Sequence, residues 1–333
     1  MGRYQVLRMA SLYLWFGFIA IIIFLLALDL GVFHRKVHTP GIRESLIWTA
    51  FWVTLALIFN AGIYFLYAHN VFGIADQPNG TVSGAAAAQT FFIGYIIEKS
   101  LSLDNIFVIS MVFSFFGVPR QYQHRTLFWG IFGALILRGA MILIGTALIV
   151  QFHWILYLFG LLLLITAVKM LFHQSEDVHP EKNPLVKLAQ RCLPMTGNFH
   201  AERFLVKENG RWLFTPLILT LLVVECNDLI FAIDSIPAVF AITQDPFIVF
   251  TSNVFAILGL RSLYFVMAAM IAKFKYLQVS LSLILAYVGV KLLCIDVIHH
   301  YGIDDIMTLV SLGVIVLVMT GGVAASVRAA RLN

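Results

Sequence analysis

Residues 224–238 read VECNDLIFAIDSIPA, a run in which Glu225, Asp228 and Asp234 interrupt side chains that are mostly apolar. A charged side chain at the centre of a bilayer costs at least about 2.5–3.5 kcal/mol on insertion scales. The whole chain has 333 residues, of which 61% are hydrophobic and only 12% are charged. Because ordinary soluble domains are less apolar, the sequence predicts a protein that crosses a membrane several times.

Nine apolar segments are long enough to span a bilayer, which takes about 20 helical residues. They are residues 9–33, 45–67, 86–117, 126–150, 153–172, 214–242, 247–271, 276–296 and 304–326. We therefore expect an all-α, polytopic fold in which residues 1–333 form a single membrane domain. The polar stretch 173–213 is expected to be a cytoplasmic loop, and Asn209-Gly210 within it predicts a β-hairpin.

Lys and Arg gather in every second connection between these segments, and the other connections carry none. By the positive-inside rule, this pattern places the N-terminus outside and the C-terminus in the cytoplasm. The net charge of +5 is spread over short connections and forms no large basic patch, so we expect no nucleic acid as a partner.

An internal repeat relates the two halves of the chain. The matching stretches are 104–108 (DNIFV) with 228–232 (DLIFA), 132–138 (FGALILR) with 255–261 (FAILGLR), and 167–171 (AVKML) with 289–293 (GVKLL), at offsets of 124, 123 and 122. Repeat 1 (86–172) and repeat 2 (214–296) hold three spans each, so the second copy enters the membrane from the opposite side. Inverted repeats are typical of secondary transporters. The two spans in 9–67 and the last span, 304–326, are expected to be accessory.

Oxygen-bearing side chains in the first span of each repeat define a candidate metal site. They are Glu98, Asp104 and Asn105 in repeat 1, and Glu225, Asp228 and Asp234 in repeat 2. Such oxygen ligands favour hard divalent cations, including Mg²⁺, Ca²⁺ and Mn²⁺. We expect Lys99, Arg138 and Arg261 to act as supporting counter-ions. Clustered carboxylates hold protons when no cation is bound, so entry of the ion would release protons.

Helical geometry sets a condition on this site. Asp234 follows Glu225 by nine residues, which places it about 180° away around a straight helix. We therefore expect the helix to break near Pro237, so that Asp234 can face the other carboxylates.

Four stretches together resemble the TerC family, named for tellurite resistance, and its Alx-type branch. They are EKSLSLDNIFV (98–108), FSFFGVPRQYQHRTLFWGIFGALILRGAMI (113–142), VECNDLIFAIDSIPAVFAITQDPFIVFTSN (224–253) and FAILGLRSLYF (255–265). The resemblance implies a Mn²⁺ exporter of the bacterial inner membrane in the LysE-like transporter group. It also implies that the family's acidic positions fall on Glu98, Asp104, Glu225, Asp228 and Asp234. Mn²⁺ would be the transported substrate, exchanged for protons, and no organic cofactor is expected.

Two other functions are weighed against a transporter. A membrane interaction module with a structural metal site could assist the translocon or the metal loading of exported proteins. An intramembrane aspartyl hydrolase could use Asp104 and Asp228, but the sequence lacks the Gly-x-Gly-Asp context of such proteases. A catalytic pair would also leave Glu98, Glu225 and Asp234 without a role. We therefore expect a transporter surrounded by membrane lipids, and not an enzyme.

Overall fold

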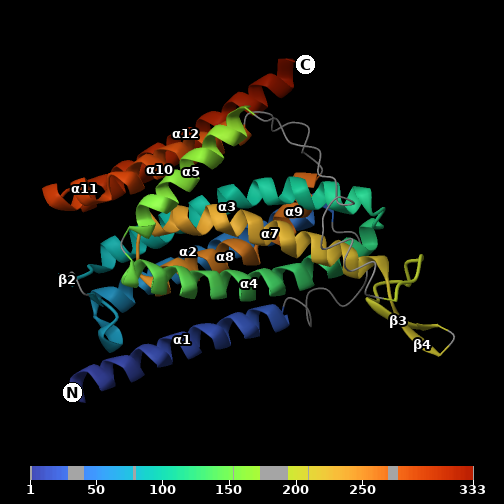
Figure 1. Cartoon of the computed structure of the whole chain (residues 1–333), viewed down its shortest axis with the longest axis horizontal. Helices are drawn as coiled ribbons and strands as arrows, with labels where there is room; N and C mark the ends of the chain where they lie inside the picture. Colours follow the sequence, from blue (N-terminus) through green and yellow to red (C-terminus); the bar gives the residue numbers. More distant parts are fainter. Residues whose placement is uncertain are drawn as a thin grey trace.

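Long helices make up most of the computed structural model, which describes residues 2–28, 41–77, 80–152, 154–172, 194–208, 210–268 and 277–332. Many of the helices run side by side (Figure 1). Within the described residues, five helices are long and apolar enough to cross a membrane, or up to seven if each bent pair forms one span. The chain is thus an all-α polytopic membrane protein. The expected count of nine spans stays a prediction.

The helices lie close to the apolar segments of the sequence. Their bounds are α1 (Gly2–Leu28), α2 (Ile42–Ala68), α3 (Gly84–Phe115), α4 (Arg120–Gln151), α5 (Ile155–Phe172), α7 (Pro216–Phe240), α8 (Pro246–Leu258), α9 (Leu260–Ala268), α10 (Leu277–Leu293), α11 (Ile295–Tyr301) and α12 (Asp304–Leu332). A short 3-10 helix, η2 (Val71–Gly73), follows α2. Two of the expected spans are bent pairs: α8 and α9 meet at 43°, and α10 and α11 meet at 61°.

Two antiparallel hairpins lie at opposite ends of the bundle (Figure 1). β1 (Asp76–Gln77) pairs with β2 (Gly80–Thr81), and β3 (Leu205–Glu208) pairs with β4 (Arg211–Phe214). The β3–β4 hairpin confirms the prediction from Asn209-Gly210, and Gly210 has the positive φ of 78° that such a tight turn favours. Much of the predicted cytoplasmic loop, 173–193, lies outside the described residues. So do Asn209 itself and residues 29–40, which include part of the basic connection 34–44.

The predicted break in the helix near Pro237 is wrong. α7 runs without interruption from Pro216 to Phe240, with Pro237 inside it. Pro237 lies close to the C-terminal end, so the helix loses one backbone donor there and keeps the rest of its ladder. One of the two breaks falls at Gly259 between α8 and α9, where the Lys99 ammonium donates to the Ala256 carbonyl over 3.1 Å. A Cβ at Gly259 would come within 2.8 Å of Lys99 Nζ, so a larger residue there would shift the Lys99 side chain.

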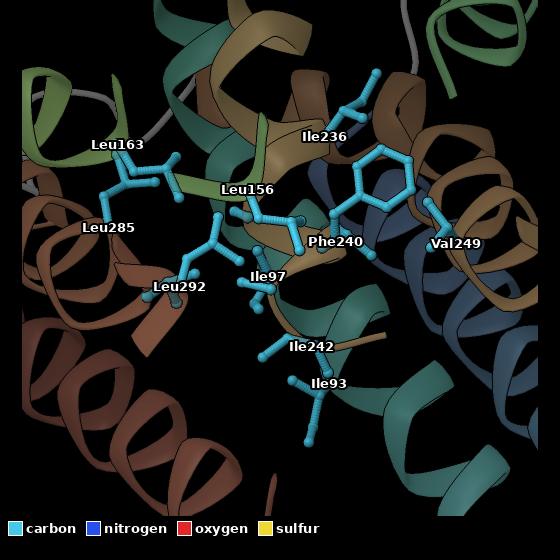
Figure 2. Close-up of a cluster of buried hydrophobic side chains, with 14 of the residues drawn as sticks. Ile93, Ile97, Leu156, Leu163, Ile236, Phe240, Ile242, Val249, Leu285 and Leu292 are labelled. Carbon is cyan, nitrogen blue, oxygen red and sulfur yellow. The ribbon is translucent and has the colours of Figure 1, made fainter. Parts of the chain in front are cut away.

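Apolar side chains from α3, α5, α7, α8 and α10 meet in the largest buried cluster. Figure 2 shows Leu156 and Leu163 of α5 facing Leu285 and Leu292 of α10, with Phe240 of α7 beside them. All five side chains are at most 1% exposed. Lipid offers apolar surroundings of its own, so this close packing, rather than escape from water, holds membrane helices together.

The contacts between α5 and α10 are reciprocal. A Cβ on Gly160 would meet the carbonyl oxygen of Gly289 at 3.0 Å, and a Cβ on Gly289 would meet the Gly160 oxygen at the same distance. Ser282 donates to the Ala167 carbonyl over 2.6 Å. At the sequence offset of 122, Gly160 corresponds to Ser282 and Ala167 corresponds to Gly289. This exchange of equivalent positions is what a twofold relation between the copies requires, although the inverted repeat itself stays a prediction.

A buried hydrogen bond ties the end of α2 to the start of α8. The Tyr67 hydroxyl donates to Asp245 Oδ2 over 2.5 Å, and Asp245 Oδ1 accepts from the amides of Phe247 and Ile248 at the helix N-terminus. Burial raises the pKa of the Asp245 carboxyl, while these hydrogen bonds act in the opposite direction. The pair therefore joins α2 to α8 at one end of the bundle.

Tyr67→Phe should lower the free energy of unfolding by about 1–3 kcal/mol, because it removes a donor from a buried carboxylate. The measurement is the unfolding temperature of the purified protein in detergent. Tyr64→Phe is the matched control, since Tyr64 lies on the same helix and is 44% exposed. Equal unfolding temperatures for the two variants would contradict a stabilising role for the Tyr67 hydroxyl.

Candidate ion site

A single buried arginine organises the polar centre of the bundle. Arg138, on α4, is 2% exposed and donates to both oxygens of Asp228 on α7, with Nη2 at 3.0 Å from Oδ1 and Nε at 3.2 Å from Oδ2. Its Nη1 also forms a close ion pair with Glu98 Oε1 on α3. A planar guanidinium suits such side-by-side recognition of carboxylates. The arginine expected to be a supporting counter-ion is therefore the group that joins α3, α4 and α7.

Neutral side chains complete the shell around this ion pair. Asn105 of α3 donates through Nδ2 to Asp228 Oδ1 over 3.1 Å. Arg138 Nη1 donates to Ser235 Oγ on α7 at 3.1 Å and to Asn253 Oδ1 on α8 at 3.3 Å. Four helices, α3, α4, α7 and α8, thus supply the network. Glu98, Asn105 and Asp228 lie together in this network.

Several buried oxygens at this centre lack a hydrogen-bond partner among the described residues. They are Glu98 Oε2, Asn105 Oδ1, Ser102 Oγ and Glu225 Oε2. Buried polar atoms are normally paired, and exceptions ask for an explanation such as an ion or a water molecule. Carboxylate, amide and hydroxyl oxygens are the ligands that hard divalent cations prefer. The donor set therefore fits such an ion.

Glu225 lies beside a glycine on the neighbouring helix. A Cβ on Gly133 of α4 would overlap the Glu225 carboxylate group, so that group occupies space that only glycine leaves open. Glu225 is half-buried, whereas Glu98 is 0% exposed. Because Glu225 and Asp228 are three residues apart on α7, they share a helix face.

The remaining predicted residues lie elsewhere or outside the described part. Asp234 accepts a 2.9 Å hydrogen bond from Thr166 on α5, and the continuous α7 does not turn it toward Glu225. Asp104 falls within α3, but its side chain lies outside the described residues. Lys99 bonds a backbone carbonyl rather than a carboxylate, and Arg261 of α9 is buried at 3% exposure.

Among the described residues, no group of three or more His, Cys, Asp or Glu side chains is arranged to hold a metal ion. Two of the carboxylates, Glu98 and Asp228, form ion pairs with Arg138 instead, so their oxygens already have a cationic partner. Metal binding by the predicted residues stays a prediction.

Sequence reasoning missed Asn253 as a member of the network. It stands in the run Thr251-Ser252-Asn253 inside an otherwise apolar span, and all three residues are at most 1% exposed. Three adjacent polar residues in a membrane helix are a usable signal, because each must find an internal partner. The signal was weaker than that of the carboxylates, since none of the three carries a charge.

An all-α bundle with a buried ion network at the junction of its helices defines a polytopic integral membrane protein. The chain belongs to the Integral membrane protein TerC family, which it matches over residues 83–332. It is 50% identical over 283 residues to "Uncharacterized membrane protein STKORF319" of Myxococcus xanthus, covering 85% of this chain and 84% of that protein. It is 45% identical over 311 residues to "Putative membrane-bound redox modulator Alx" of Escherichia coli K12, covering 92% of each chain. No solved structure matches this chain.

Proposed function

We propose that this TerC-family protein is a secondary transporter that exports Mn²⁺ from the cytoplasm in exchange for protons. The observation that carries the proposal is the set of buried, unpartnered oxygens of Glu98, Asn105 and Glu225 beside the Asp228 ion pair, counted among the described residues. Oxygen ligands of this kind suit Mn²⁺. A site inside the bundle, between the first helices of two repeats, is also where secondary transporters bind their substrates.

The placement of helix ends supports an alternating topology. Tyr67 and Asp245, which the sequence places on the outer side, lie together, as do Arg125 and Glu202, which it places in the cytoplasm. Figure 1 shows the N-terminus at the end that holds β1 and β2, opposite the end that holds β3 and β4. We propose a location in the bacterial inner membrane with the N-terminus outside and the C-terminus in the cytoplasm.

The test of this function is transport by the purified protein in liposomes, with Mn²⁺ and Ca²⁺ supplied separately. Mn²⁺ should accumulate in proteoliposomes and not in matched protein-free liposomes. Protein that is folded and inserted into the liposomes but moves neither ion would rule out a transport function. It would leave the interaction module with a structural site, which the ion pairs of Arg138 with Glu98 and Asp228 also suit.

The name of the E. coli relative describes a redox modulator. In this chain the described cysteines, Cys226 on α7 and Cys294 after α10, are free thiols. Cys226 follows Glu225, so its oxidation would place a polar group beside the proposed site. Mn²⁺ transport by the Cys226→Ser variant and by the wild type is compared with and without an oxidant. Equal transport under both conditions would show that the thiol has no role. A response to the oxidant in the wild type alone would favour a redox function.

Gly133→Ala should lower the apparent affinity for Mn²⁺ at least about 10-fold, because the new methyl group would displace the Glu225 carboxylate. Gly130→Ala is the matched control, one turn earlier on α4, where a Cβ would make an ordinary 3.5 Å contact with Val224. The measurement is the concentration dependence of Mn²⁺ uptake. Similar affinities in the two variants would remove Glu225 from the proposed site.

A further inference from the structure

The Arg138 guanidinium occupies the oxygens that a transported ion would need. It donates to Glu98 Oε1 and to both carboxylate oxygens of Asp228, and Asn105 donates to one of those two. An ion that binds Asp228 therefore competes with Arg138 for the same two oxygens. Since four helices surround the side chain, this displacement changes contacts between α3, α4, α7 and α8.

The charges favour one cation at a time. Glu98, Asp228 and Arg138 together carry one net negative charge, whereas the two carboxylates with a divalent ion are neutral. A divalent ion and a guanidinium on the same two carboxylates also repel each other, and the repulsion is stronger in the protein interior than in water. Glu225, three residues before Asp228 on α7, adds a third carboxylate that reduces this repulsion. The guanidinium and the ion therefore compete for Glu98 and Asp228.

Arg138 must move to vacate the site, because a guanidinium does not lose its proton in proteins. Its long side chain can move while the backbone of α4 stays in place. Ser235 Oγ and Asn253 Oδ1 already accept from Nη1 at 3.1 and 3.3 Å. These neutral acceptors can hold the displaced guanidinium without competing for the ion.

We propose that Arg138 is a tethered cation that alternates with the transported ion on Glu98 and Asp228. When the ion leaves, Arg138 returns to the carboxylates, which balances one of their two negative charges and opposes rebinding. Arg138 is thus a positioning residue that sets the affinity for the ion and promotes its release. This inference rests on the proposed function, because it needs a divalent ion at the same carboxylates.

The experiment measures Mn²⁺ binding and turnover in the same variants of the purified full-length protein. Mn²⁺ is titrated into protein in detergent, and free Mn²⁺ is followed by its electron paramagnetic resonance signal. The variants are Arg138→Gln, which removes the charge, and Arg138→Lys, which keeps a charge that cannot bind two oxygens side by side. Arg125→Gln is the matched control, on the same helix but paired with Glu202 near its start.

Arg138→Gln should bind Mn²⁺ at least about 10-fold more tightly than the wild type and should transport it at least about 10-fold more slowly in liposomes. The affinity and transport rate of Arg138→Lys should lie between those of the wild type and Arg138→Gln. This variant still tests the inference if Arg138→Gln does not fold. Arg125→Gln should bind like the wild type. Tighter binding with slower transport separates this role from a purely structural one, which would weaken both.

Folded Arg138 variants that bind Mn²⁺ equally or more weakly, beside a wild type that binds and transports it, would overturn this inference alone. Absence of Mn²⁺ binding and transport in the wild type and all variants would overturn the proposed function together with the inference. The two failures are therefore distinguishable in one set of measurements.

Discussion

Asp228→Asn should abolish Mn²⁺ efflux. The amide keeps the shape of the side chain but removes the negative charge that, with Glu98, would balance a divalent ion. Among the described residues, Arg138 would then have one carboxylate partner, Glu98, instead of two. Cells loaded with Mn²⁺ and then moved to metal-free medium should retain the ion as cells without the protein do, which elemental analysis over time would measure.

The control for this variant is Asp296→Asn. Asp296, on α11, accepts a hydrogen bond from Tyr157 at an exposed position, so the same chemical change is made away from the buried network. It should export Mn²⁺ at the wild-type rate. Membrane levels must be compared, because breaking a buried ion pair can cost about 3–5 kcal/mol of stability. Asp228→Asn that is present at normal levels and exports normally would remove Asp228 from the site.

A pH gradient should drive Mn²⁺ uptake into everted membrane vesicles. Carboxylates that bind either protons or a metal ion couple the two flows, so an acidic lumen would exchange its protons for external Mn²⁺. Each proton exchanged contributes about 1.36 kcal/mol per pH unit, so two protons would sustain about a 100-fold gradient of the metal. The measurement is Mn²⁺ uptake before and after nigericin collapses the pH gradient.

Vesicles that contain Asp228→Asn protein serve as the control for this second prediction, because they keep the gradient and lose the site. They should take up no more Mn²⁺ than vesicles without the protein. Wild-type uptake that ignores the pH gradient and releases no protons would contradict proton exchange, while leaving Mn²⁺ transport itself intact.

Local features of the chain were predictable from its sequence. Apolar runs marked the helices because a membrane helix must satisfy its backbone internally, and the turn residues marked the β3–β4 hairpin. Charge in a membrane segment also demands a partner. That demand identified Glu98, Asp228 and Arg138, which the structure places in contact.

Features that depend on tertiary contacts were not predictable. Helical angles correctly separated Asp234 from Glu225. They could not show that Thr166 on α5 donates a hydrogen bond to Asp234, so that no break at Pro237 is needed to give Asp234 a partner. At the corner near Gly259, Lys99 of α3 donates to the Ala256 carbonyl, a contact between residues far apart in the sequence. Asn253 joins the network only because the arginine is long enough to reach α8.

Metal-resolved flux in proteoliposomes tests the central claim most directly. Purified wild-type protein should carry Mn²⁺ across the membrane, and Asp228→Asn protein reconstituted at the same density should match empty liposomes. Wild-type protein that is folded, inserted and moves no Mn²⁺ would contradict the account.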